Sequence, residues 1–179
     1  LVEGYDAIIH LAGVNIGEKR WSQSRRAAIL SSREVPTHHL SEAISDLRDP
    51  PLFICASAIG WYGNRGEERL TESSEAGTGF LSEVCRSWER ATGPAVVAGV
   101  RTVFLRTGIV LWGVGGVLER LHLPFRLGLG GPIAGGNQYM SWIHLDDWVR
   151  AVHFLLQHEG ADGVYNLTAP SPKSNARFT

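Results

Sequence analysis

The chain has 179 residues, a length that suits one domain, or most of one, built around a single hydrophobic core. Its 17 basic and 18 acidic side chains give a formal net charge of -1 without any block of like charges, which favours a small-molecule partner over nucleic acid or an anionic membrane. No apolar run approaches the ~20 residues that a membrane span requires.

The first half of the chain alternates apolar runs with helical spacing. Residues 6–12 form a short apolar run that predicts a buried strand. Apolar positions three and four residues apart predict a helix over about 22–47, which Pro36 should kink or split because proline removes a backbone donor. A second apolar strand is expected at 52–58, followed by a polar loop at 64–79.

The second half continues the alternation. A helix is expected from Phe80, strands are expected at 102–111 and 163–167, and a helix between those strands should be capped by Asp146 or Asp147. Apolar strands that alternate with helices are typical of βαβ units and of a parallel sheet covered on both faces. The sequence therefore predicts a doubly wound α/β fold.

The glycines of residues 60–66 follow a predicted strand and suggest a dinucleotide phosphate turn. Such a turn must open a helix whose N-terminal N–H groups face the pyrophosphate. Because a polar loop without helical period follows Gly66, we reject this segment as the phosphate site.

Four segments resemble motifs of the extended short-chain dehydrogenases/reductases, in the order of that family. They are residues 6–13, 55–63, 105–111 and 140–147. Three further segments are similar to an atypical "epimerase family" branch of the NAD-dependent epimerase/dehydratase superfamily, at 15–21, 125–132 and 165–170.

This resemblance implies that residues 1–179 form a partial, Rossmann-like NAD(P)-binding domain that is truncated at both ends. The first βαβ unit, with its Gly-rich turn, is expected before Leu1, and a short C-terminal domain after Thr179. Substrate-lobe insertions are expected at about 113–145 and at the C-terminal end.

The resemblance also implies a cofactor, NADP(H) or alternatively NAD(H), at the ends of the strands. The positions expected to contact it are Leu11, Ala12, Gly13, Ala56, Ser57, Thr107 and Gly108. Arg33 is expected to face the nicotinamide ribose or the phosphates, or else to be a plain surface arginine. Arg106 leaves a strand end, where an unpaired charge is costly to bury, so we expect it to contact the cofactor or another anionic partner.

The family chemistry uses a tyrosine whose pKa is lowered by a lysine one helical turn later. No Tyr-x-x-x-Lys exists in this sequence. The family pattern places Phe80 or Leu81 at the tyrosine position and Val84 or Cys85 at the lysine position. Loss of a placed acid/base forfeits ~10² to 10⁴ in rate, so either another group substitutes or the standard reaction is not catalysed.

Ser57 is the candidate to polarise a substrate carbonyl, with Tyr62, His144 or Asp147 as candidate proton donors. Tyr62 is alternatively a packed aromatic residue with a satisfied hydroxyl, and His144 and Asp147 alternatively serve the backbone of a helix end. Substrate contacts are expected from Asn15, Trp142 and His144.

Three histidines are given no functional role, and of these His38 and His39 are expected to be solvated on a surface helix. His10 lies in an apolar strand and is expected to be a neutral, hydrogen-bonded core histidine. His38 and His39 lack a third ligand, so no metal site is predicted.

Two functions remain open at this stage. One is an oxidoreductase or epimerase-like enzyme that acts on a sugar-like or hydroxylated small molecule, and the other is a non-catalytic dinucleotide-binding redox sensor or scaffold. Cys55 and Cys85 are expected to be buried thiols in a reducing compartment, which favours the cytoplasm while leaving an organelle-targeting segment open. A homodimer is a further possibility.

Overall fold

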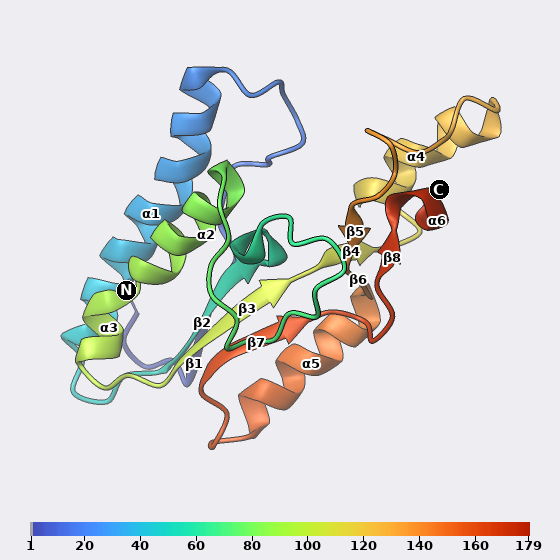
Figure 1. Ribbon diagram of the computed structural model, residues 1–179. Coiled ribbons are helices and arrows are strands. Elements are labelled where there is room, and N and C mark those ends of the chain that lie inside the picture. The colour runs from blue at the N-terminus through green and yellow to red at the C-terminus, as the bar shows by residue number, and fades with distance from the viewer. Residues whose placement is uncertain (1) are drawn as a thin grey trace.

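The computed structural model describes residues 2–179 and is organised around one parallel sheet (Figure 1). Its strands lie in the order β1 (Ala7–His10), β2 (Leu52–Ala58), β3 (Thr102–Thr107) and β7 (Gly163–Leu167). All three neighbouring pairs are parallel. Their carboxyl ends therefore meet at one edge of the sheet.

Helices cover both faces of this sheet, as Figure 1 shows. On one face lie α1 (Gln23–Ser45), α2 (Phe80–Arg90) and the short α3 (Gly93–Val97), and α5 (Leu145–Gln157) lies on the other. Each face has its own apolar cluster. The α1–α3 side buries Ile44, Phe53, Cys55, Trp88, Ala95 and Val100, and the α5 side buries Leu52, Ile54, Val103, Leu105, Ile143, Val152, Leu155, Ala161 and Leu167. The predicted doubly wound α/β fold is confirmed.

Pro36 was expected to kink or split the helix, and the split is wrong, because α1 runs unbroken through that residue. A proline inside a helix removes one backbone hydrogen bond. The flanking turns bury Ile29, Thr37, Ser41 and Ile44. This packing on both sides of the proline holds the two halves in one helix.

The strand expected at 102–111 is two strands. The chain leaves the main sheet at Gly108, and β4 (Ile109–Leu111) pairs with β6 (Trp142–His144) instead. A Cβ at Gly108 would lie 2.8 Å from the backbone oxygen of Ser141, so only glycine allows this close crossing.

Helix α4 (Gly116–Arg126) and the segments around β5 (Tyr139–Met140), β8 (Lys173–Ser174) and α6 (Asn175–Phe178) form a separate lobe at the carboxyl edge of the sheet (Figure 1). Helix α4 is followed by a glycine-rich loop and by β5, which pairs with β8. Helix α6 ends the chain, and its Asn175 Oδ1 accepts a hydrogen bond from the Ile133 N–H. The C-terminal segment thus fixes the glycine-rich loop.

The cap of α5 is also different from the expectation. His144, rather than Asp146 or Asp147, precedes the first turn, and its Nδ1 accepts a hydrogen bond from the Asp146 N–H at 3.2 Å. The two aspartates lie inside the first turn, where negative charge favours the positive end of the helix dipole.

Between β2 and α2 the chain forms a short 3₁₀ helix, η1 (Ile59–Tyr62), and then an irregular loop that crosses the face of β3 and β7 (Figure 1). No helix opens at Gly66, which agrees with the rejection of a phosphate turn there. Within residues 2–179, no helix is both long and apolar enough to cross a membrane.

Candidate functional site

Three polar residues form a row across the carboxyl ends of the central strands. Ser57 on β2 is in register with Arg106 on β3, and Arg106 is in register with Asn166 on β7. Neighbours in register on parallel strands point to the same face, which here is the face that α2 covers. The row places the predicted catalytic and cofactor positions 57 and 106 side by side.

Arg106 is buried, and protein atoms satisfy each of its nitrogens. Its Nε and Nη2 donate to the two carboxylate oxygens of Glu89 at 2.9 Å, and Nη1 donates to the Tyr62 hydroxyl and to the Glu72 backbone oxygen. The guanidinium also lies 3.9 Å from the ring centroid of Trp61. The anion expected beside Arg106 is therefore Glu89 of this chain, so the charge of Arg106 does not require a cofactor contact.

The pKa of Arg106 reflects two opposing causes. Burial acts to lower it, but the hydrogen bonds with Glu89 and Tyr62 raise it, and together they prevail. A bidentate pair of this kind is among the stronger polar contacts in proteins.

Ser57 is buried and donates its hydroxyl proton to Glu89 Oε1 at 2.6 Å. A hydroxyl has one proton to donate. In this arrangement Ser57 offers lone pairs, rather than a proton, to any further group. Polarisation of a substrate carbonyl by Ser57 would require this hydrogen bond to open.

Tyr62 matches the structural alternative considered from the sequence. Its side chain is buried, with 4% of its surface exposed, and its hydroxyl donates to Asn166 Oδ1 at 2.6 Å while accepting from Arg106. Its proton is thus already bound inside the protein. A catalytic role for Tyr62 remains a prediction that this packing does not favour.

Arg33 lies on α1 beside the loop that follows β1. Its Nη1 donates to the backbone oxygens of Val14 and Ile29, and its guanidinium carbon lies 4.9 Å from the ring centroid of Trp88. Burial lowers the pKa of Arg33 below its ordinary value. This half-buried cation is not the plain surface arginine of the sequence alternative.

The residues that end β1 leave open surface. Leu11, Ala12 and Gly13 are exposed, and a Cβ at Gly13 would meet the guanidinium carbon of Arg33 at 2.9 Å. Glycine at this position therefore allows the cation to lie against the backbone.

The remaining predicted cofactor positions lie on the two central strands. Ala56 is half-buried in β2, whereas Thr107 ends β3, where its hydroxyl accepts from Trp148 Nε1 at 3.1 Å. Gly108 is at the crossing point between the main sheet and β4. These positions share the carboxyl edge with Ser57 and Arg106.

The positions of the family tyrosine and lysine carry apolar or thiol groups here. Phe80 packs edge-on against Trp21, with ring centroids 5.3 Å apart, and Leu81 and Cys85 lie against Gly60. Burial raises the pKa of Cys85 to about 11, so its thiol stays protonated at neutral pH. No acid/base pair replaces the missing dyad at these positions.

The three predicted substrate contacts come from two places. Asn15 lies in the loop after β1, where its side chain accepts from the Gly17 N–H. Trp142 and His144 lie on β6, and the exposed His144 ring meets Trp112 edge-on at 5.9 Å. The hydrogen bonds of Asn15 in residues 2–179 go to Gly17 and Arg25 rather than to β6, so their shared role stays a prediction.

Sequence analysis missed two residues of this site, Glu89 and Asn166. Glu89 binds both Ser57 and Arg106, and Asn166 binds the Tyr62 hydroxyl. Glu89 follows Trp88 and lies four residues after Cys85, at the border of the apolar stripe of α2, and this position is the one available sequence signal. His10 is confirmed as a hydrogen-bonded core residue, with Nε2 2.8 Å from Thr37 Oγ1.

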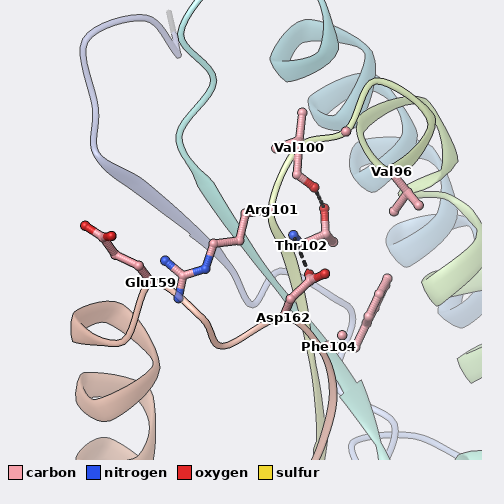
Figure 2. A pocket seen from close by; sticks show the side chains of 9 residues that line it. Val96, Val100, Arg101, Thr102, Phe104, Glu159 and Asp162 are labelled. Atoms are coloured by element: carbon pink, nitrogen blue, oxygen red, sulfur yellow. Dashed lines mark hydrogen bonds between the residues drawn. The ribbon is translucent and has the colours of Figure 1, made fainter.

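A cavity of about 450 Å³ lies at the opposite, amino-terminal edge of β3 and β7 (Figure 2). Val96, Val100 and Phe104 form part of its wall, with Glu159 and Asp162 on the other side. Arg101 in this cavity donates to backbone oxygens near the C-terminal end of α5, including that of Leu155 at 2.8 Å. Arg101 thus caps the C-terminal end of α5.

Comparison with known proteins agrees with this arrangement. Residues 1–168 match the NAD dependent epimerase/dehydratase family. An "epimerase family protein" of Mycobacterium leprae is 47% identical over 174 residues, which are 97% of this chain and 56% of that protein. The chain thus spans little more than half of this relative's length.

Two solved structures are similar in fold and sequence. One is a nucleoside-diphosphate sugar epimerase from Corynebacterium glutamicum, with a TM-score of 0.88 and 41% identity over 99% of this chain and 37% of that one. The other is the human epimerase family protein SDR39U1 with NADPH, with a TM-score of 0.88 and 34% identity over 97% of this chain and 60% of that one.

Proposed function

Because this chain belongs to the NAD-dependent epimerase/dehydratase family, we propose that it forms part of a protein that binds NADP(H) at the carboxyl edge of its parallel sheet. The proposed reaction is hydride transfer between the nicotinamide and a carbon of a sugar-like or otherwise hydroxylated small molecule. NADP(H) is proposed ahead of NAD(H) because the human relative was solved with NADPH.

The observation that carries this proposal is the combination of groups where β1 and β2 end. Exposed small residues, Ala12 and Gly13, leave room for a flat ligand, and Arg33 supplies positive charge beside them. Ligands of doubly wound folds bind outside the carboxyl ends of the strands. This donor set fits an anionic dinucleotide.

In the proposed complex each group of this chain has a limited role. Residues 11–13 would contact the cofactor through the backbone, and Arg33 would offset negative charge. Ala56 and Ser57 would line the floor, and Thr107 and Gly108 would line the wall of the site. The bound nicotinamide would supply the hydride donor or acceptor, and Asn15, Trp142 and His144 would contact the substrate.

A second candidate is a non-catalytic dinucleotide-binding protein that senses redox state or serves as a scaffold. The specific observation in its favour is that the hydroxyl groups of the candidate catalytic residues already donate hydrogen bonds to other side chains of the protein. Ser57 donates to Glu89, Tyr62 donates to Asn166, and the two residues that fit the family tyrosine position, Phe80 and Leu81, carry no acid/base group. The two candidates make the same prediction for cofactor binding and opposite predictions for turnover.

The test begins with an NADPH fluorescence titration of the protein that includes the first βαβ unit expected before Leu1, for which we expect micromolar affinity, beside residues 1–179 alone, for which we expect weaker binding. Hydride transfer is then followed from deuterium-labelled NADPH to a library of nucleotide sugars and simple hydroxylated or carbonyl compounds. Label transfer that Ser57→Ala weakens would support the enzyme. Tight binding without transfer to any compound would support the sensor, and absence of binding would contradict both.

Three broader proposals accompany this function. The partner is a small molecule, with neither nucleic acid nor membrane involved. The compartment is cytoplasmic, since Cys55 and Cys85 are buried free thiols that suit a reducing environment. The outer groove between α1 and α2, lined by Val35, His39 and Arg90 among others, is the proposed contact of a homodimer, which sedimentation would test.

A further inference from the structure

We propose that Glu89 is a positioning residue that fixes the hydroxyl proton of Ser57, and that Ser57 therefore selects a ligand group that donates a hydrogen bond, such as the hydroxyl of an alcohol, over a carbonyl group. This inference rests on the proposed function, because it names the chemical form of the substrate that the same site prefers. It gives Glu89 a role in recognition in addition to its ion pair with Arg106. Cofactor binding is measured separately in the test, so that failure of the two proposals can be distinguished.

The hydroxyl of Ser57 has one proton, and that proton is committed to a carboxylate. Ser57 Oγ donates to Glu89 Oε1 at 2.6 Å. The carboxylate of an ion pair only accepts hydrogen bonds, so Ser57 is the donor in this contact. Hydrogen bonds to a charged partner are about twice as strong as those between neutral groups. Ser57 thus presents lone pairs, and no proton, to any third group.

Glu89 cannot turn away from Ser57 without losing Arg106. Its two carboxylate oxygens accept from Arg106 Nε and Nη2 at 2.9 Å each, and 10% of its side chain is exposed. Breaking a buried pair of this kind leaves an uncompensated charge, which is costly. The carboxylate therefore stays in place as the acceptor of the Ser57 proton.

Arg106 is itself held from three other segments. Its Nη1 donates to the Tyr62 hydroxyl and to the Glu72 backbone oxygen, both at 3.1 Å, and its guanidinium lies over the Trp61 ring. Tyr62 in turn donates to Asn166 Oδ1 on β7. Supporting contacts of this kind lock the side chains of a site in one geometry. The direction of a single proton on β2 is thus set by a network that spans the sheet.

The lone pairs of Ser57 have no donor in the described part of the chain. Across residues 2–179 the one hydrogen bond of its Oγ is the bond to Glu89, and the neighbouring thiol of Cys85 donates to the Ala58 backbone oxygen instead. Ser57 is the last residue but one of β2, at the edge where ligands of this fold class bind. With 4% of its surface exposed, it has little access to water. A donor on the ligand would satisfy this acceptor.

An alcohol and a carbonyl group differ in what they offer to such an oxygen. A hydroxyl donates its proton to Ser57, whereas a carbonyl oxygen places its own lone pairs against those of Ser57. A site built around a hydrogen bond rejects a ligand that lacks the matching group, because a buried polar atom is then left unpaired. Ser57 therefore prefers the hydroxylated form of the substrate and releases the carbonyl form.

The first test follows the Ser57 Cβ resonance by NMR in ¹³C-serine-labelled protein that includes the unit expected before Leu1, in equal parts of H₂O and D₂O. The resonance is assigned by its absence in Ser57→Ala. A hydroxyl proton that exchanges slowly gives two lines, one for each isotope. We expect two lines for Ser57 and one averaged line for the exposed Ser171. A single line for Ser57 would overturn the proposal, because its proton would not be fixed.

Glu89→Asp separates the ion pair from the positioning of Ser57. Aspartate keeps the charge but withdraws the carboxylate by one methylene, and the long Arg106 side chain can follow it, whereas the short Ser57 side chain on β2 cannot. We expect one averaged line for Ser57 in protein that still unfolds cooperatively in urea. Glu83→Asp makes the same change at an exposed position of α2 and should keep both lines. Two lines in Glu89→Asp would overturn the role of Glu89.

The second test compares tert-butanol with acetone in protein saturated with NADP⁺, where the alcohol cannot be oxidised and the ketone has no hydride to accept. The ratio of their dissociation constants is measured by ligand-observed NMR. The preference for the alcohol should fall about 10-fold in Ser57→Ala, which is the equivalent of one net hydrogen bond. Acetone should bind more tightly to Glu89→Asp than to the wild type, since the Ser57 proton is then free to be donated.

The remaining results separate this proposal from the proposed function. An equal ratio in the wild type and both variants, or no binding of either probe, in protein that binds NADPH by fluorescence, would overturn the selection by Ser57 and leave the cofactor site standing. Two lines for Ser57 that become one in Glu89→Asp, in protein that does not bind NADPH, would support the positioning by Glu89 and contradict the proposed cofactor.

Discussion

Two arginines on the same side of the sheet have opposite surroundings. Arg106 has 4% of its side chain exposed and gives its Nε–Nη2 fork to Glu89, whereas the half-buried Arg33 has the same fork free. Buried charge is stable when it is paired and hydrogen-bonded within the protein. The comparison teaches that Arg106 joins β3 to α2, and it is the reason for proposing Arg33 as the cation that meets a ligand.

The largest expected effect on stability comes from removing Glu89, the ion-pair partner of Arg106. Glu89→Ala leaves the charge of Arg106 buried without a partner, so the free energy of unfolding should fall by about 3–5 kcal/mol in urea denaturation. Arg86→Ala, on the exposed face of the same helix, is the control and should change it by less than about 0.5 kcal/mol. A loss no larger than that of the control would show that the pair does not stabilise the fold.

A smaller effect is expected from Tyr62→Phe, which removes the hydroxyl between Asn166 and Arg106. The half-buried Asn166 acceptor then lacks its donor, so the free energy of unfolding should fall by about 1–3 kcal/mol. NADPH affinity should stay within twofold of the wild type. If the measured transfer of deuterium from labelled NADPH fell ~10²-fold or more while stability held, Tyr62 would be the missing acid/base after all.

The free energy of unfolding is expected to depend on pH through His10, which lies on β1. Burial lowers the pKa of His10, so the folded protein holds the imidazole neutral while the unfolded chain binds a proton below about pH 6.5. Stability from this group is complete above that pH and is lost as the pH falls, by at most about 1.4 kcal/mol per pH unit.

His10→Gln should flatten the dependence of the urea midpoint on pH between 7 and 5. His153→Gln, on the exposed face of α5, should leave it as in the wild type. An unchanged slope in His10→Gln would mean that other groups cause the acid sensitivity.

The smallest effect on stability is expected from Gly13→Ala. The added Cβ would meet the end of the flexible Arg33 side chain, which can shift. The free energy of unfolding should therefore change by less than about 1 kcal/mol. The displaced guanidinium should nevertheless bind pyrophosphate more weakly. Unchanged pyrophosphate affinity in a calorimetric titration would indicate that Arg33 does not need its place against the backbone.

Sequence patterns correctly predicted those elements whose ends are marked by nearby residues. Strands β2 and β7 match their expected limits, since prolines precede the first and a glycine opens the second. The break at Gly108 was not predicted. A glycine in a strand indicates a bend, but the change of partner to β6 depends on a segment more than thirty residues later.

The candidate site was predicted only in part, because the partners of its residues come from segments distant in the sequence. The cost of burying Arg106 predicted that an anion would lie beside it, but not that Glu89 would be that anion, because α2 meets β3 through tertiary packing. Arg33 was left between two alternatives, since its surroundings are set by Gly13, Val14 and Trp88 from separate segments.

The measurement that tests this account most directly is amide hydrogen exchange of the full chain with and without NADPH. We expect slower exchange at residues 10–14, 29–37 and 56–63 on binding, and no change at 96–104 and 159–163, which line the cavity at the opposite edge. Protection confined to that opposite edge, in protein that binds NADPH, would contradict a ligand site at the carboxyl ends of the strands.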